Sequence, residues 1–193
     1  MSITTDIRSL PRQSISLSMG ELVPDTIQTI SVTPMPKCAL GNENAYLLGC
    51  RFVQLLLRQN DHGRLSHREK EMLPWMTALR VELRRLGVTG IRSEVSLPST
   101  EHIAGGRCDL LVEGGHATNG VIEVKVSHTT PSAVPPECLA QLGGYSHLLA
   151  EQSGKPVWAA AAWVNFRTNT VRVFTFKDAS RLGEKARDLL NAA

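Results

Sequence analysis

The sequence predicts an α/β protein whose central sheet is mixed, with both antiparallel and parallel strands, and is flanked by helices. Three short β-branched runs, at 91–97, 107–112 and 121–126, are separated by glycine-rich turns, as hairpin-connected antiparallel strands are. A helical segment after Pro135-Pro136 then leads to the wholly apolar run 156–164, which is typical of a buried central strand. A crossover helix of this kind returns the chain parallel to the strand before it.

Helical patterns occupy both flanks of this region. We expect one helix at 45–58, a second one beginning in the capping-box sequence Ser66-His-Arg-Glu69 and reaching Leu86, and a final helix capped by Asp178. Within the second helix, Pro74 either kinks the helix or moves its start. The run 170–176 is expected to pair with the apolar strand across a short turn. The predicted order is therefore α-α-β-β-β-α-β-β-α.

The chain is long enough for one well-buried domain and too short for two large ones. Residues 1–40 are rich in Ser, Thr and Pro, and they form either a flexible arm or a short added strand. We expect a single domain over 41–193, made of a helical part (41–88), a core (89–177) and a C-terminal helix (178–193).

Composition is that of an ordinary globular protein, and the net charge of +3 permits a nucleic-acid partner without requiring one. The sequence has no apolar run that could span a bilayer and no secretory signal at its start. Its four cysteines lack Cys-x-x-Cys spacing, and the apolar neighbours of Cys50 and Cys108 suggest buried thiols. We therefore expect no membrane partner and an intracellular protein, cytoplasmic or, if the source is eukaryotic or viral, nuclear.

The polar residues that carry chemistry lie on the predicted strands. Glu123 and Lys125 are two apart, so they project from one face of a strand, and an antiparallel neighbour can bring Asp109 beside them. Carboxylates among apolar residues pair with a cation or bind a metal, and oxygen ligands suit Mg²⁺ or Mn²⁺. The alternative is that Glu-x-Lys is simply the solvated face of an amphipathic strand.

Four pieces occur in a fixed order along the chain: Glu94, then Gly106 to Asp109, then Glu123 to Lys125, then Gln141 with Tyr145. This ordered set resembles the PD-(D/E)XK nuclease superfamily, and the Gln-x-x-x-Tyr element is similar to its RecB-like and lambda-exonuclease-like branch. The resemblance covers roughly residues 90–165 and implies a restriction-endonuclease-like core with an N-terminal helical region. The chain departs from the pattern where some relatives carry a helical histidine or glutamate. There it has Phe52-Val-Gln54, which leaves only Glu71 or Glu82 as an upstream carboxylate.

The resemblance also implies roles for individual residues. Asp109, Glu123 and the backbone carbonyl of Val124 are expected to hold Mg²⁺ or Mn²⁺. Lys125 is expected to orient or deprotonate the attacking water and to stabilise the pentavalent state. Catalytic positions are also implied for Glu94, Gln141 and Tyr145, with the last two sharing one face of a helix that looks onto the site.

Nucleic acid is the expected partner, with contacts at Arg107, Tyr145, Arg84 and Arg85. The last two lie off the apolar stripe of their helix, and the alternative reading is an ordinary solvated helix face. The leading hypothesis is a metal-dependent nuclease acting on DNA, as an exonuclease or a structure-specific endonuclease. The alternatives are an RNA-directed endonuclease of the cap-snatching kind and a non-catalytic nucleic-acid-binding or assembly module that retains the fold. Oligomeric state is left open.

Overall fold

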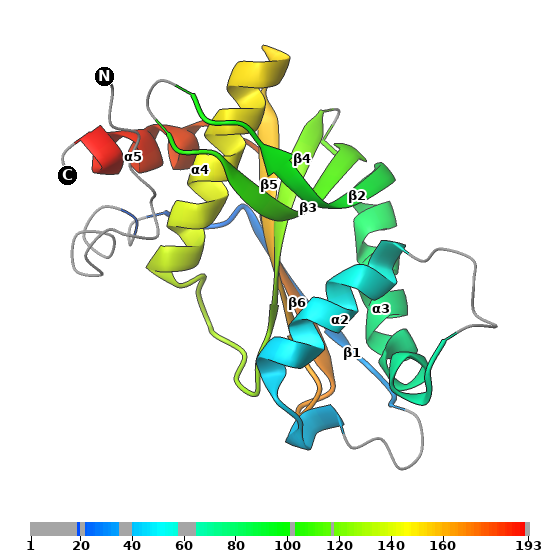
Figure 1. The fold of residues 1–193 in the computed structure, drawn as a ribbon. Helices are drawn as coiled ribbons and strands as arrows, with labels where there is room; N and C mark the ends of the chain where they lie inside the picture. The colour runs from blue at the N-terminus through cyan, green and yellow to red at the C-terminus, as the bar shows by residue number, and fades with distance from the viewer. Residues whose placement is uncertain are drawn as a thin grey trace.

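The structure, a computed structural model, describes residues 19, 22–34, 40–57, 65–100, 103–116 and 118–191. Its helices and strands follow the chain in the order β1 (Thr26–Ser31), η2 (Leu40–Asn42), α2 (Ala45–Leu57), α3 (His67–Arg85), β2 (Val88–Leu97), β3 (Gly106–Gly114), β4 (Asn119–Val126), α4 (Pro136–Ser153), β5 (Val157–Asn165), β6 (Thr170–Phe176) and α5 (Ser180–Asn191). The expected α/β fold with a mixed sheet flanked by helices is confirmed (Figure 1). Most of the expected N-terminal arm, together with Arg58 at the expected end of the first helix, lies outside the described residues.

The six strands form one sheet in the order β1-β6-β5-β4-β3-β2. β2, β3 and β4 are antiparallel neighbours, β4 and β5 are parallel, and β5 and β6 are antiparallel again. The predicted return across α4 is therefore confirmed. The sequence allowed either a flexible arm or an added strand within residues 1–40. Strand β1 lies in this stretch, pairs with β6 and forms one edge of the sheet.

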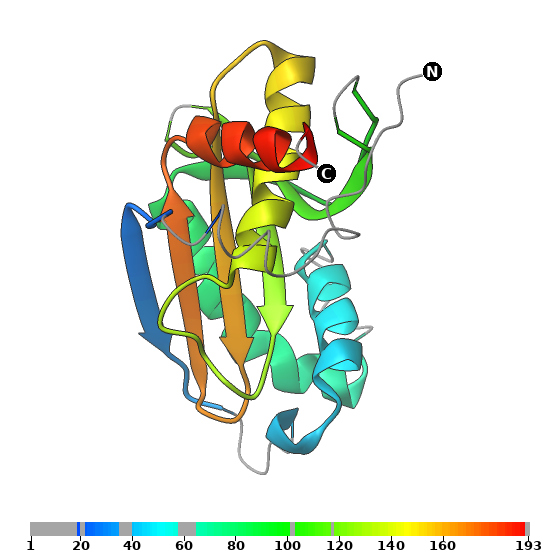
Figure 2. The same ribbon diagram turned by 90° about the vertical axis from the view of Figure 1, so that its left-hand side faces the viewer.

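Two hydrophobic cores lie on opposite faces of the sheet, and Figure 2 shows the helices that cover them. On one face, α4 and α5 pack over apolar residues that include Val121, Ala161 and Phe174. On the other face, α2 and α3 pack over Ile122, Val124 and Ala162. Alternate residues of β4 and β5 serve opposite cores, so both strands are buried on both faces. The apolar run of β5 predicted this burial.

Local sequence accounts for the ends of the helices. Ser66 accepts a hydrogen bond from the Glu69 N–H, and the Glu69 carboxylate accepts one from the Ser66 N–H, so the expected capping box is present. Helix α3 continues through Pro74, which does not move its start. Asn44 caps α2 through its side-chain oxygen, which accepts from the Tyr46 and Leu47 N–H groups. Where α5 crosses α4, a Cβ at Gly143 would collide with the Leu182 carbonyl, so this glycine permits the close approach.

One expectation about the cysteines is wrong. Cys108 is buried as predicted, but Cys50 is exposed. The buried stripe of α2 runs through Leu48, Phe52, Leu55 and Leu56, which are one helical face, and Cys50 lies off that stripe. Its apolar sequence neighbours belong to the core even though Cys50 does not.

Candidate active site

The register of the sheet brings three carboxylates into one row across β2, β3 and β4. Ser93 pairs with Leu110 and Val95 with Cys108, so the register sets Glu94 opposite Asp109. The β3–β4 register ends at Leu110 opposite Ile122, and one step further it sets Asp109 opposite Glu123. The sequence motifs that are far apart in the chain therefore meet at one level of the sheet.

Strands β3 and β4 separate at this level. Instead of a main-chain carbonyl, the Oδ2 atom of Asp109 accepts the Val124 N–H at 2.8 Å. Because the N–H and C=O of one strand residue point to the same side, the Val124 carbonyl also faces the Asp109 side of β4. This places two of the expected metal ligands, the Asp109 carboxylate and the Val124 carbonyl, at the same edge.

Glu94 has a left-handed backbone conformation, with φ of 49°. Such a conformation is uncommon for residues other than glycine and is found at sites where structure elsewhere holds it in place. On either side of it β2 changes faces, because Ile91 packs against the α2–α3 core whereas Val95 packs against the α4–α5 core. The irregularity at Glu94 thus turns the end of β2 toward α4.

Lys125 is the cation of the site and has two side-chain partners. Its Nζ donates to Glu123 Oε1 at 2.6 Å and to Gln141 Oε1 at 3.2 Å. Glu123 is only 5% exposed, so this ion pair places a nearly buried charge beside its counter-charge. Gln141, on α4, accepts this hydrogen bond from the helix side of the site.

Tyr145, one turn further along α4, packs against the start of β3. A Cβ built on Gly106 would lie 2.8 Å from the Tyr145 Cε1 atom, which is closer than a real side chain allows. Gly106 therefore lets the ring approach the strand closely, three residues before Asp109. Tyr145 is 9% exposed and belongs to the α4–α5 core.

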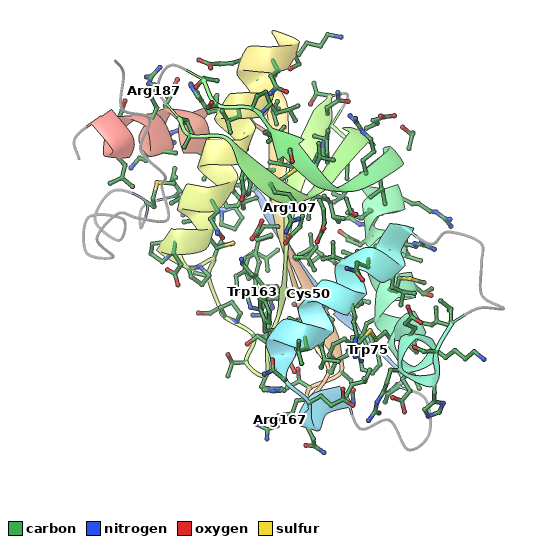
Figure 3. The ribbon with its side chains drawn as sticks, in the orientation of Figure 1. Cys50, Trp75, Arg107, Trp163, Arg167 and Arg187 are labelled. Atoms are coloured by element: carbon green, nitrogen blue, oxygen red, sulfur yellow. The ribbon has the colours of Figure 1, made fainter. Side chains whose placement is uncertain are left out.

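A cavity of about 290 Å³ contains most of these groups. Its lining from the strands consists of Glu94, Arg107, Asp109, Glu123, Val124, Lys125 and Val126. Helix α2 forms the facing wall, with Ala45, Tyr46, Gly49, Cys50 and Val53. Figure 3 labels one residue from each side, Arg107 on β3 and Cys50 on α2.

The electrostatics of the cavity follow from burial. Burial raises the pKa of Asp109, and the nearby Glu94 carboxylate raises it further, while the Val124 N–H, Lys125 and Arg107 oppose the rise. Burial by itself lowers the pKa of Lys125, but the charge and hydrogen bond of Glu123 outweigh it, and the pKa of Lys125 is raised. Lys125 is therefore held as a cation beside Glu123, where it can stabilise negative charge that develops on a phosphate.

The oxygen donors of the cavity suit a hard divalent cation that takes only some of its ligands from the protein. Within the described residues, no three Asp, Glu, His or Cys side chains form a ready-made metal cluster. Mg²⁺ usually binds through one or two carboxylates and keeps several waters, and does not require an all-protein cage. The Asp109 and Glu123 carboxylates with the Val124 carbonyl match that pattern, so the residues present fit Mg²⁺ or Mn²⁺.

Other expected site residues lie elsewhere. Arg84 and Arg85 are in the last turn of α3 and do not line the cavity, and Arg85 is paired with Glu82 through two hydrogen bonds. Glu71 is likewise paired, with Arg68. Neither Glu71 nor Glu82 lines the cavity, so neither replaces the missing helical ligand.

The cavity wall formed by α2 was not predicted from the sequence. Tyr46, Gly49, Cys50 and Val53 recur at helical spacing, which was the signal available, but the helix is apolar on several sides and the spacing does not reveal which side faces a cavity. Arg107, by contrast, was expected to contact substrate, and it does line the cavity, with its side chain 66% exposed and 3.5 Å from Glu94.

No protein-family model matches the chain, and no curated protein matches it. Among solved structures, the chain is similar to one described as the crystal structure of SSO0001, at 15% sequence identity over 72% of each chain and with a TM-score of 0.35. Among the described residues, no helix is long and apolar enough to cross a membrane.

Proposed function

We propose that the protein is a Mg²⁺- or Mn²⁺-dependent nuclease of the PD-(D/E)XK type that hydrolyses phosphodiester bonds, with DNA as the favoured substrate. One observation carries the proposal: Glu94, Asp109, Glu123, Lys125 and Arg107 line a single cavity. Carboxylates beside a lysine and an arginine offer ligands for a cation together with positive charge for a phosphate.

The residues divide the work of hydrolysis. Asp109, Glu123 and the Val124 carbonyl are the ligands for the divalent ion, which when bound neutralises phosphate charge and polarises a water. Lys125 supplies a fixed positive charge where negative charge develops on the phosphate oxygens, and its N–H groups orient the attacking water. The water adds to phosphorus and releases a proton to solvent, the bond from phosphorus to the leaving sugar oxygen breaks, and that oxygen takes up a proton from solvent.

Three further residues position these groups. Gln141 accepts a hydrogen bond from Lys125 and so limits where the ammonium can point. Tyr145 fixes the start of β3 by packing on Gly106. Arg107 lies at the exposed side of the cavity, where its guanidinium can bind a phosphate next to the scissile one.

Incubation of the purified protein with Mg²⁺ or Mn²⁺ and linear or circular, single- or double-stranded DNA and RNA tests the proposal. We expect metal-dependent cleavage that EDTA stops and that Asp109→Ala abolishes while circular dichroism stays unchanged. Cleavage restricted to RNA would favour the RNA-directed alternative. Binding without cleavage at any metal concentration would favour a non-catalytic module and would overturn the proposed activity.

A further inference from the structure

The wall of the cavity opposite the charged strands carries an exposed aromatic ring. Tyr46 is 77% exposed, yet it lines the same cavity as Asp109, Glu123 and Lys125. A single exposed apolar side chain is ordinary on a protein surface, so exposure alone says little. What distinguishes Tyr46 is its place, beside the groups that would meet a phosphate. Its neighbours on the wall, Gly49 and Cys50, are small and uncharged.

The position of the ring is fixed by its helix. Tyr46 is in the first turn of α2, and its N–H donates to the capping oxygen of Asn44 at 2.9 Å. The Asn44 oxygen also accepts the Leu47 N–H, so the amides of Tyr46 and Leu47 both have a partner in the cap. The exposed phenol ring is the group of Tyr46 that remains for a ligand. Helix α2 lies against β4 here, because a Cβ built on Gly49 would be in ordinary contact with the Val126 side chain, at 3.7 Å.

The two sides of the cavity are complementary to the two parts of a nucleotide. Arg107 and Lys125 supply positive charge for a phosphate on the strand side, and Tyr46 supplies a flat apolar face on the helix side. A base can lie on an aromatic ring only on a face that no neighbouring base covers. In a duplex both faces of an interior base are stacked, whereas in an unpaired strand or a frayed end a base is free to turn onto the ring.

We propose that Tyr46 is a stacking platform for one unpaired base beside the scissile phosphate, and that the site therefore selects single-stranded or frayed nucleic acid over intact duplex. This inference rests on the proposed nuclease function for the identity of the ligand. The ring binds whichever base is presented, because every base has a flat face, so the selection is for strandedness and not for sequence.

The test compares Tyr46→Ser, Tyr46→Phe and the matched control Leu47→Ala, which truncates an exposed apolar side chain on the same turn that does not line the cavity. Binding is measured by fluorescence anisotropy in Ca²⁺ with one oligonucleotide as a single strand and as a blunt duplex. Tyr46→Ser should weaken single-strand binding by about 5- to 150-fold, the range of one base–aromatic stack, and change duplex binding less than about twofold. Tyr46→Phe and Leu47→Ala should bind the single strand like the wild type.

A spectroscopic measurement separates stacking from a structural role. In a single strand that carries 2-aminopurine, stacking on the ring should quench the fluorescence of the base, and Tyr46→Ser should restore it while Leu47→Ala should not. Equal single-strand affinity in Tyr46→Ser and wild type, with metal-dependent cleavage intact, would overturn this inference and leave the nuclease proposal standing. Tyr46-dependent single-strand binding in a protein that cuts no nucleic acid would support the platform and overturn the nuclease. Absence of any nucleic-acid binding would overturn both.

Discussion

Replacing Lys125 by methionine tests how strongly the ion pair at the centre of the site is coupled to the fold. The Lys125 Nζ atom lies 2.6 Å from Glu123 Oε1, and the Glu123 side chain is 7% exposed whereas that of Lys125 is 34% exposed. Methionine keeps the length and apolar stem of lysine and removes the charge. The nearly buried carboxylate of Glu123 then loses its cation.

The expected cost lies between two limits. Removing one partner of a fully buried pair costs about 3–5 kcal/mol, and an exposed pair contributes about 0–1 kcal/mol. Because a third of Lys125 is exposed to water, we expect Lys125→Met to lower the free energy of unfolding by about 2–3 kcal/mol. Converting Glu123 to glutamine removes the unpaired charge, so the double variant Lys125→Met/Glu123→Gln should recover at least half of the loss.

Urea denaturation at pH 7 in EDTA, on wild type, both single variants and the double variant, completes the double-mutant cycle. Lys155→Met, at an exposed lysine, is the matched control and should change the free energy of unfolding by less than about 0.5 kcal/mol. If Lys125→Met is as stable as the control, or if the double variant is no more stable than Lys125→Met alone, the two charges are not coupled and the reasoning from burial is wrong. The double variant should remain inactive even when its stability recovers.

Three further predictions concern the neighbours of this pair. Burial raises the folded-state pKa of Asp109, so the protonated carboxyl favours folding and that contribution is lost as pH rises through the folded pKa. Asp109→Asn is uncharged at every pH and keeps an oxygen for the Val124 N–H. In thermal melts in EDTA it should therefore be more stable than wild type at pH 7 but not at pH 3. Mn²⁺ at millimolar concentration should raise the melting temperature of wild type and leave that of Asp109→Asn unchanged, since the ion relieves repulsion between the carboxylates, and an equal rise in both proteins would place the ion elsewhere. Tyr145→Phe keeps the ring against Gly106, so its melting temperature should lie within about 2 °C of that of wild type. It should lower the single-turnover cleavage rate, but by less than Lys125→Met does. Full activity in Tyr145→Phe would show that Tyr145 serves only in packing.

Much of this fold could be predicted from the sequence because most of its strands have a clear pattern of apolar residues. The continuous apolar run of β5 required burial on both faces, and the helix that precedes it required a parallel return. Strand β1 carried no such signal. Its residues are exposed except for the half-buried Ile30, and it is held by main-chain pairing with β6, which leaves little hydrophobic pattern to detect.

Some features of the site also had a signal in the sequence, and others had none. The alternation in β4 predicted that Glu123 and Lys125 share a face, and helical spacing predicted the same for Gln141 and Tyr145. The hydrogen bond from Lys125 to Gln141 depends on how α4 packs on the sheet, which neither pattern shows. The left-handed backbone of Glu94 had no sequence signal, because glutamate does not favour that conformation and the surrounding strands impose it. The wall of α2 also depended on tertiary packing, and Tyr46 was found only when the helix was seen beside the strands.

Whether this cavity is the catalytic site is tested by cleavage of DNA by wild type and Lys125→Met in Mg²⁺, under single-turnover conditions and at a temperature where both are folded. We expect the substitution to lower the cleavage rate at least about a hundredfold, because the lost cation acts where negative charge develops in the transition state. The product yield of Lys155→Met should match that of wild type. A Lys125→Met protein that cuts DNA at the wild-type rate would show that this cavity is not the catalytic site.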